Sequence, residues 1–253
     1  MITLTTTDGI ATLVLSRPPV NAISDDLITL FDAKLDELAK RSDWKILHLR
    51  SDQKVFCAGA DLKEVRDRFE APDGLDRTAS YVARLQKLYS RIERLPQVTL
   101  AEISGGAIGG GLELALACDL RIVALDAKLG LPETRLGLIP GGGGTQRMTR
   151  LCGQAVAARL ILGAEILDGT EAARLGVAQW AVAPADIAAR ASEIAHRIAA
   201  LPAAALQASK TCIATSNEPG DRGYVEELEA TRRLSANSET RERVKAFLAG
   251  QRQ

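Results

Sequence analysis

The chain has 253 residues, which is long for one domain and short for two, and its 46% hydrophobic content is enough for a large core. Its 32 Lys and Arg residues balance 32 Asp and Glu residues. This zero net charge argues against a nucleic-acid-binding protein, which usually carries a basic excess, and no apolar run is long enough to span a bilayer.

The first hundred residues alternate between strand and helix patterns. Asp8-Gly9 predicts a tight hairpin between two strands, and Ser24 is a typical helix cap. We expect the charged stretch 66–76, which contains turn-forming residues, to be a mobile surface excursion. In chain order the patterns predict strands over 2–7 and 10–16, a helix after Ser24, a strand over 44–50, a loop over 51–63, a helix over 78–95 and a strand over 98–103.

The second part of the chain becomes entirely helical after Pro184. We therefore predict an α/β body over residues 1–183 and an all-helical region over 184–253, which must pack on the body or on another subunit. The expected elements are a central helix from Leu112, strands over 121–124 and 128–131, a helix over 145–151 capped by Thr145, helices over 153–163 and 168–176, a strand over 177–182, and helices over 186–200, 202–216, 221–235 and 239–249.

The four cysteines are scattered and have no C-x-x-C spacing. Most of them lie in apolar patterns, which favours reduced, buried thiols. The N-terminal residues enter a strand pattern directly, without the basic and apolar regions of a targeting sequence. From these features we expect a cytoplasmic protein.

A glycine-rich stretch, Gly105 to Gly111, joins the strand over 98–103 to the central helix. Glycines let backbone N–H groups approach a ligand, and the first N–H groups of a helix have no internal partner. Such a place stabilises an oxygen that gains negative charge during a reaction, and Glu113 lies in the first helical turn beside it. Glycine-rich turns also serve close helix–strand packing, so this stretch alone leaves both functions open.

Several kinds of chemistry are disfavoured. His48 and His196 are the two histidines, and both lie in patterns typical of structural residues, which argues against a Ser-His-Asp or Cys-His mechanism. No metal-binding motif is present, and no glycine cluster fits a dinucleotide or P-loop pattern. Glutamate chemistry beside backbone donors remains, without a metal or other cofactor.

Four motifs in order then resemble the enoyl-CoA hydratase (crotonase) superfamily. They cover nearly the whole chain, and their order and spacing make the resemblance specific. The resemblance implies a spiral of β-β-α units that ends in a helical region used to form a homotrimer, often a dimer of trimers. The motifs are FCAGAD at 56–61, ISGGAIGGGLEL at 103–114, LPE at 131–133 and LIPGGGGTQR at 138–147.

The resemblance also implies site residues. The carbonyl oxygen of an acyl-CoA thioester would accept hydrogen bonds from the backbone N–H groups of Ala60 and Gly110, which form an oxyanion hole. The loop Ala60, Asp61, Leu62 and Lys63 matches the family's CoA-contacting segment. Coenzyme A would enter as part of the substrate. Read without the resemblance, Ala60-Asp61 is a plain turn and Lys63 a solvated side chain.

Glu113 and Glu133 match the two catalytic glutamates of hydratases. Adding water across a 2,3-double bond needs one group that deprotonates water and one that protonates C2, and a carboxylate and a carboxylic acid in one pocket provide both. By the resemblance Glu113 activates water and Glu133 protonates C2. The resemblance thus implies a 2-enoyl-CoA hydratase that performs reversible syn hydration in acyl-CoA metabolism such as β-oxidation.

Some features stay open. The second cluster, Gly141 to Gly144, looks like a phosphate cradle, but we expect it to be structural, and Arg147 has no assigned role. Glu102 adds a carboxylate whose direction the sequence does not reveal. The alternatives are an enoyl-CoA isomerase, a specialised dehydratase of the carnitinyl-CoA type or, more remotely, an RNA-binding member. The basic residues over 34–45 are interleaved with acidic ones, which argues against RNA binding.

Overall fold

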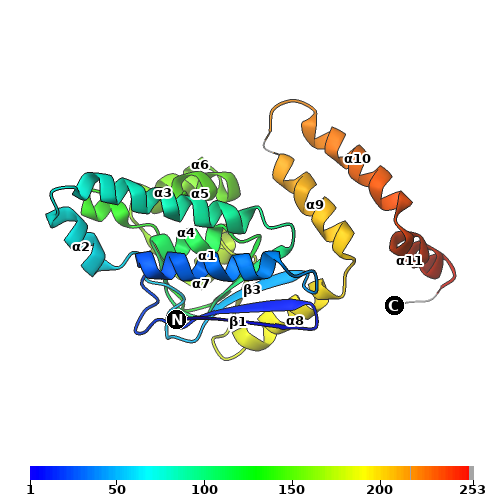
Figure 1. Ribbon diagram of the computed structural model, residues 1–253, viewed down its shortest axis with the longest axis horizontal. Coiled ribbons are helices and arrows are strands. Elements are labelled where there is room, and N and C mark those ends of the chain that lie inside the picture. Colours follow the sequence, from blue (N-terminus) through cyan, green and yellow to red (C-terminus); the bar gives the residue numbers. More distant parts are fainter. Residues whose placement is uncertain (217, 251–253) are drawn as a thin grey trace.

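The computed structural model describes residues 1–216 and 218–250 (Figure 1). Within these residues the larger sheet has six strands in the order β1-β2-β3-β4-β6-β9. The β1–β2 pair is antiparallel and the other pairs are parallel. The strands are β1 (Ile2–Thr7), β2 (Ile10–Leu15), β3 (Ile46–Ser51), β4 (Val98–Ile103), β6 (Leu120–Ala124) and β9 (Trp180–Val182).

A smaller sheet lies beside the larger one and has the order β5-β7-β8. The chain leaves the larger sheet after β4 to form β5, returns as β6, leaves again for β7 and β8, and returns as β9. This alternation between two sheets gives the chain a spiral path. The short strands are β5 (Ala107–Ile108), β7 (Leu129–Gly130) and β8 (Ile166–Leu167).

The predicted hairpin is confirmed. Thr7 pairs with Ile10, and the two residues between them have positive φ, 52° at Asp8 and 77° at Gly9. These are the left-handed conformations that a two-residue turn needs and that Asp-Gly adopts readily. The prediction of a helix after Ser24 is also confirmed, because the Ser24 side chain accepts a hydrogen bond from the Leu27 N–H.

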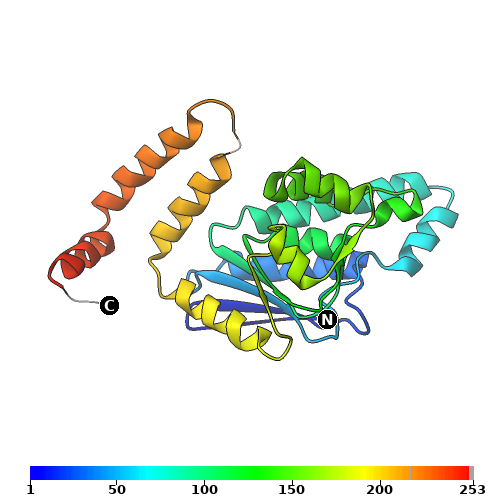
Figure 2. The same cartoon turned by 180° about the vertical axis from the view of Figure 1, so that it is seen from behind.

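Helices cover both faces of the larger sheet. Leu15 of β2 lines a small cavity together with Phe31 of α1 and Leu114 of α4, so these two helices face the same side of the sheet. The opposite face is covered by α8, which contacts β2, β3, β4 and β6 (Figure 2). Helix α3 packs on α1. The bounds of these helices are α1 (Asp25–Ala39), α3 (Gly74–Glu93), α4 (Gly110–Leu116) and α8 (Ile187–Ala199).

The stretch 66–76 lies at the surface, as expected, but most of it is helical: helix α2 covers Leu62–Glu70 and α3 begins at Gly74 after a short turn. The Asp61 carboxylate caps α2 by accepting hydrogen bonds from the N–H groups of Lys63 and Glu64 at 3.0 and 3.4 Å. The side chain that anchors α2 is Arg68, which is only 4% exposed. An apolar periodicity does not detect this helix, because its buried residue is charged.

The remaining helices of the body follow β7 in the chain; α5 packs on α4 and α6, and α7 contacts β8. The prediction that Thr145 caps a helix is wrong, because that helix begins at Gly144 and its cap is Gly143 with a φ of 109°. Glycine adopts this conformation without strain, so it replaces a polar cap here. These elements are η1 (Glu133–Leu136), α5 (Gly144–Cys152), α6 (Gln154–Ile161) and α7 (Gly169–Arg174).

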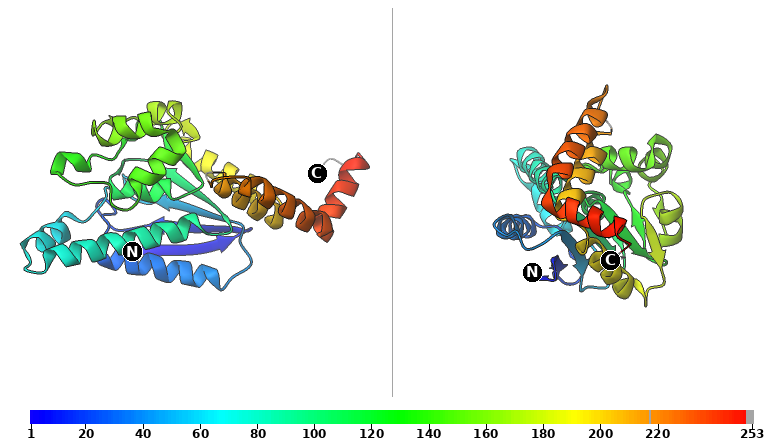
Figure 3. Two further views of the ribbon diagram at one scale, coloured as in Figure 1. Left: turned by 90° about the horizontal axis from the view of Figure 1, so that it is seen from above. Right: turned by 90° about the vertical axis from the view of Figure 1, so that its right-hand side faces the viewer.

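The C-terminal helices extend away from the body (Figures 1 and 3). The predicted helices over 202–216, 221–235 and 239–249 are confirmed as α9 (Ala203–Thr215), α10 (Arg222–Ala236) and α11 (Ser238–Leu248). The domain boundary at residue 183 stays a prediction. Helix α8 lies after this boundary but packs on the sheet, and the C-terminal tail, which consists of α9, α10 and α11, begins after α8. In the part of the chain that the structure describes, no helix combines the length and apolarity needed to cross a membrane.

Candidate active site

The first glycine cluster brings two chain segments into backbone contact. Helix α4 begins at Gly110, directly after Gly109, whose φ of 55° turns the chain. A Cβ atom at Gly111 would lie 2.1 Å from the carbonyl oxygen of Cys57, and one at Gly59 would lie 3.4 Å from the Gly110 nitrogen. Side chains at these positions would push the segment 57–60 away from the start of α4.

This contact leaves two N–H donors unused. Ala60 forms a parallel bridge with Ile23, in which the Ile23 N–H donates to Gly59 and the Asp61 N–H donates to Ile23. In this pattern the Ala60 N–H does not take part in the bridge. Among residues 1–216 and 218–250, neither the Ala60 N–H nor the Gly110 N–H donates a hydrogen bond. The Gly110 N–H also lies at the positive end of the α4 dipole.

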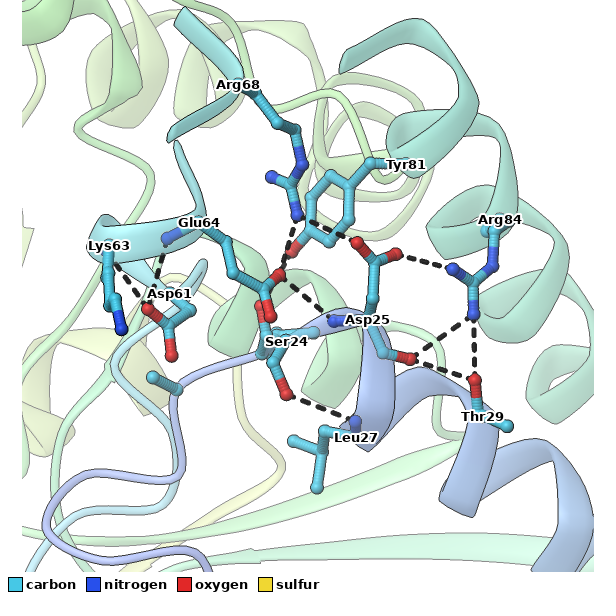
Figure 4. A network of polar contacts seen from close by, with 12 residues as sticks. Ser24, Asp25, Leu27, Thr29, Asp61, Lys63, Glu64, Arg68, Tyr81 and Arg84 are labelled. Carbon is cyan, nitrogen blue, oxygen red and sulfur yellow. Dashed lines mark hydrogen bonds and ion pairs between the residues drawn. The ribbon is translucent and has the colours of Figure 1, made fainter. Parts of the chain in front are cut away.

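A network of charged side chains holds the segment that carries Ala60 (Figure 4). The Tyr81 hydroxyl donates to the Ile23 carbonyl at 3.0 Å, and the Arg68 guanidinium lies 3.9 Å above the Tyr81 ring. Arg68 also donates to Glu64 at 2.7 Å and to Asp25 at 3.3 Å. The start of α1 and helices α2 and α3 are thus joined around the Ile23–Ala60 bridge.

The predicted CoA-contacting residues span the beginning of α2. The Asp61 carboxylate forms an ion pair with Arg17 at 2.6 Å. Burial raises the pKa of Asp61, but the hydrogen bonds from Arg17 and from the Glu64 and Lys63 N–H groups outweigh burial and lower it. The Asp61 carboxylate is therefore already bound by groups of the protein itself. The side chain of Leu62, the next residue, is exposed to solvent.

The second glycine cluster surrounds the carboxyl group of Glu113. This side chain is 2% exposed, and its Oε1 accepts a hydrogen bond from the Gly144 N–H at 2.7 Å. A Cβ atom at Gly142 would lie 2.7 Å from Glu113 Oε2, and one at Gly144 would lie 2.9 Å from Oε1. The loop that resembled a phosphate cradle binds a carboxyl group of the protein itself.

The pKa values of both predicted glutamates lie above the ordinary value of a glutamate. Burial raises the pKa of Glu113 to about 7, the Gly144 N–H opposes that rise, and the charge of Glu133 adds to it. Burial also raises the pKa of Glu133. Within the described residues Glu133 Oε2 is buried and has no hydrogen-bond partner, and Oε1 lies 3.0 Å from the position of a Cβ at Gly109. The two carboxyl groups therefore interact beside the first glycine cluster.

The sequence pattern does not reveal the place of two residues beside this site. The Tyr89 hydroxyl donates to the Gly110 carbonyl at 2.7 Å, and a Cβ at Gly142 would lie 2.9 Å from the Tyr89 ring, so this residue contacts both clusters. In the sequence Tyr89 falls on the apolar stripe of its helix, four residues after Leu85, and therefore looks like an ordinary core residue. Arg147 is the second such residue, and it is buried as well.

Glu102 points away from this site. It lies on β4 next to Ala101, which pairs with Leu49 of β3, and therefore shares a face with His48 rather than with Leu15, which faces α1. The His48 ring nitrogen lies 2.8 Å from the Glu102 carboxylate, and both side chains are buried. The extra carboxylate is thus a structural partner of His48 on the face covered by α8.

The four cysteines are free thiols. Cys57 and Cys118 are buried, and burial raises the pKa of each thiol to about 12. Within residues 1–216 and 218–250, no three His, Cys, Asp or Glu side chains gather in a way that could hold a metal ion. The chemistry available at the site is that of two carboxyl groups and two backbone donors.

Comparisons with known proteins point to one family. The enoyl-CoA hydratase/isomerase family model matches residues 5–252. A putative enoyl-CoA hydratase/isomerase of Bacillus subtilis is 36% identical over 95% of this chain and 92% of that protein. The mitochondrial methylglutaconyl-CoA hydratase of Mus musculus is 42% identical over 67% of this chain and 53% of that protein.

The fold agrees with these matches. The crystal structure of enoyl-CoA hydratase from Bacillus anthracis superimposes with a TM-score of 0.91 at 32% identity, over 98% of this chain and 96% of that one. The predicted crotonase-like α/β spiral with a helical C-terminal region is thereby confirmed.

Proposed function

The chain belongs to the enoyl-CoA hydratase/isomerase family, and on that basis we propose that it is a 2-enoyl-CoA hydratase. The reaction is the reversible syn addition of water to the 2,3-double bond of an acyl-CoA thioester, which gives a 3-hydroxyacyl-CoA. The observation that carries this proposal is the pairing of two interacting glutamates with raised pKa and two N–H donors that no described residue uses, that of Gly110 at the start of α4 and that of Ala60 in the segment packed against it.

The N–H groups of Ala60 and Gly110 act on the thioester carbonyl. When water attacks C3, electrons move through the conjugated system onto the carbonyl oxygen and form an enolate. Two donors that are already oriented stabilise this charge without reorganising solvent, and removing one such donor typically costs about 10²–10³ in rate. The Gly110 donor gains from the α4 dipole.

The two glutamates divide the proton transfers. In the hydration direction ionised Glu113 takes a proton from water while the water oxygen bonds to C3, and protonated Glu133 gives its proton to C2 as the enolate collapses. The raised pKa of both groups supports a site that holds one proton near neutral pH.

The loop Ala60–Lys63 is proposed to contact the CoA portion of the substrate.

The alternatives are weaker. An enoyl-CoA isomerase needs one base to move a proton between two carbons, so two glutamates with raised pKa exceed its requirement. A carnitinyl-CoA type dehydratase would use both glutamates in the reverse direction on a specialised acyl group. RNA binding is disfavoured because basic residues of the α1 region form local ion pairs, Lys34 with Glu37 and Arg41 with Asp43.

A substrate panel tests the proposal. Hydration of crotonyl-CoA removes the absorbance of the conjugated thioester, whereas an isomerase leaves it unchanged. The panel should include longer enoyl thioesters, carnitinyl-CoA and 3-methylglutaconyl-CoA, since one relative bears the name of a methylglutaconyl-CoA hydratase. Loss of absorbance and appearance of the 3-hydroxyacyl-CoA by mass spectrometry are the expected result. Isomerisation of a 3-enoyl-CoA without hydration of any 2-enoyl-CoA would contradict it.

We further propose that the chain forms a homotrimer or a dimer of trimers. The tail carries apolar side chains that are 62–79% exposed, which is unusual unless another surface covers them. Sedimentation velocity of the full chain should give the mass of a trimer or hexamer, and a stable monomer would contradict the proposal. These side chains are Ile213, Tyr224, Leu228, Phe247 and Leu248.

A further inference from the structure

Arg147 is a buried cation that joins three parts of the body. It lies on α5 and is 4% exposed. Its Nε and Nη2 both donate to the Glu93 carboxylate of α3, at 3.1 and 2.8 Å. Its Nη1 donates to the carbonyl oxygen of Gly142 at 2.9 Å, and Nη2 lies 3.4 Å from the Ser90 hydroxyl. One guanidinium thus connects α3, α5 and the second glycine cluster.

The glycine cluster is wound closely around this guanidinium. A Cβ at Gly143 would lie 2.3 Å from Arg147 Nη1, and the φ of 109° at Gly143 turns the chain there. The loop presents the Gly142 carbonyl to Arg147 and, two residues later, the Gly144 N–H to Glu113. One short segment of backbone therefore forms the hydrogen bonds to both the Arg147 guanidinium and the Glu113 carboxyl group.

The charges around Glu113 give Arg147 an electrostatic effect as well. Glu133 of η1 and the buried hydroxyl of Tyr89 on α3 also face Glu113. Burial and the charge of Glu133 raise the pKa of Glu113, while the N–H groups of Gly144 and Gly142 and the charge of Arg147 lower it. Glu93 offsets part of the Arg147 charge, but its side chain is 39% exposed and water screens it.

We propose that Arg147 is a positioning residue for Glu113. It holds the second glycine cluster so that the N–H groups of the loop grip the carboxyl group, and its charge favours the ionised form that takes a proton from water. The role in water activation rests on the proposed hydratase function, whereas the effect on Glu113 itself can be measured without any substrate.

A simpler role would be to fasten α5 to α3, and Arg150 separates the two roles. It lies on the same helix and also approaches Glu93, at 3.6 Å, but its side chain is 50% exposed. Its Nε donates a hydrogen bond to the carbonyl oxygen of Gln146 on its own helix. Arg150 therefore links the same two helices as Arg147 but, among the described residues, forms no hydrogen bond with the glycine cluster, and it serves as the matched control.

The first experiment titrates Glu113 directly in the full chain. The carboxyl carbon is followed by ¹³C NMR without substrate, in a Glu133→Gln background that removes the coupled titration. Arg147→Gln, which loses the charge but keeps a donor, should raise the pKa of Glu113 by about one unit. Arg147→Lys should leave it within about half a unit, because the charge remains. Arg150→Gln should not change it.

An unchanged Glu113 midpoint in Arg147→Gln, or an equal shift in Arg150→Gln, would overturn the proposal. Should Arg147→Gln not fold, Arg147→Lys decides. A lysine has no fork to hold both the Gly142 carbonyl and Glu93, so kcat should fall about 3–10-fold with the Glu113 midpoint retained. A wild-type kcat in Arg147→Lys would then refute the positioning role.

The pH profile of kcat/KM connects the effect to catalysis in the chain that retains Glu133. Because ionised Glu113 is the active form, activity is lost as the pH falls through its pKa, and Arg147→Gln should move this acid limb upward by about one unit. A limb that stays in place would contradict the proposal. If the wild-type protein hydrates no thioester, the proposed function fails, while the NMR titration still decides the role of Arg147.

Discussion

The two glycine clusters of this chain are similar in sequence but have different structural roles. Each is a glycine-rich turn that leads into a helix, α4 after the first and α5 after the second. In the first, the Gly110 N–H is unused by the described residues, whereas in the second the Gly144 N–H binds Glu113. The first can therefore receive a ligand oxygen, and the second is already occupied by a carboxyl group of the protein.

The glycines are needed for different reasons as well. In the first cluster a Cβ at Gly105 would lie 2.1 Å from the carbonyl oxygen of Lys54, and Gly111 is equally close to a backbone carbonyl. In the second cluster the space is filled by the ends of two charged side chains, Glu113 and Arg147. Glycine-rich turns thus serve either close backbone packing or the burial of charged groups, and only the neighbours distinguish the two.

The largest expected effect comes from the carboxyl group beside each cluster. Glu113→Gln and Glu133→Gln should each lower kcat by about 10²–10⁴, the usual cost of losing a general acid or base. The loss of thioester absorbance measures this rate. Glu102→Gln is the control, since Glu102 faces the other side of the sheet and should keep kcat within about threefold. Wild-type rates in both site variants would remove the two glutamates from the mechanism.

A smaller effect should follow from filling the second cluster. In Gly142→Ala the new methyl group would lie 2.7 Å from Glu113 Oε2 and 2.9 Å from the Tyr89 ring, so the carboxyl group must move. We expect kcat to fall about 10–100-fold, as for other small misplacements of a catalytic group.

Gly141→Ala is the matched control for that variant. Its methyl group would meet the Val82 side chain at 3.2 Å, which can adjust, and kcat should stay within about threefold of the wild type. Thermal unfolding of both variants separates a local effect from a loss of fold. Equal rates in the two variants would show that the second cluster does not position Glu113.

The burial of Glu113 should also make stability depend on pH. Its folded pKa of about 7 lies above the ordinary value of 4.5, so the folded state holds the proton more tightly than the unfolded state. The free energy of unfolding should therefore fall as the pH rises from 4.5 to about 7, by roughly 1–3 kcal/mol.

Denaturant titrations at pH 5 and pH 8 measure this difference. Glu113→Gln removes the titrating group, so the variant should lose less stability over this interval than the wild type. A variant with the same pH dependence as the wild type would assign the effect to other carboxyl groups.

The smallest expected effect concerns the residue that contacts both clusters. Tyr89→Phe removes the hydrogen bond to the Gly110 carbonyl and keeps the ring beside Gly142. A loss of about 1 kcal/mol is expected, which corresponds to about a fivefold lower kcat/KM. Tyr224→Phe, on a side chain that is 71% exposed, should leave kcat/KM unchanged. An unchanged value in Tyr89→Phe would mean that Gly110 does not depend on this bond.

Local features of the fold could be predicted because they depend on neighbours in the chain. The Asp8-Gly9 turn, the cap at Ser24 and the tail helices follow from contacts within about four residues. The place of Glu113 in the first turn of α4 is equally local. Helix α2 at Leu62–Glu70 was not predicted, because it depends on Arg68 packing against Tyr81, a contact between two helices.

The roles of the glycine clusters were decided by tertiary packing. The hydrogen bond between Gly144 and Glu113 joins residues that are 31 positions apart, and Arg147 reaches Glu93 across 54. No periodicity or spacing encodes such pairs, because their approach depends on how α3, α4 and α5 pack. The amino-acid order supplies the glycines, the glutamates and local features such as the Asp8-Gly9 turn, and the packed fold determines which backbone N–H groups remain available to a substrate.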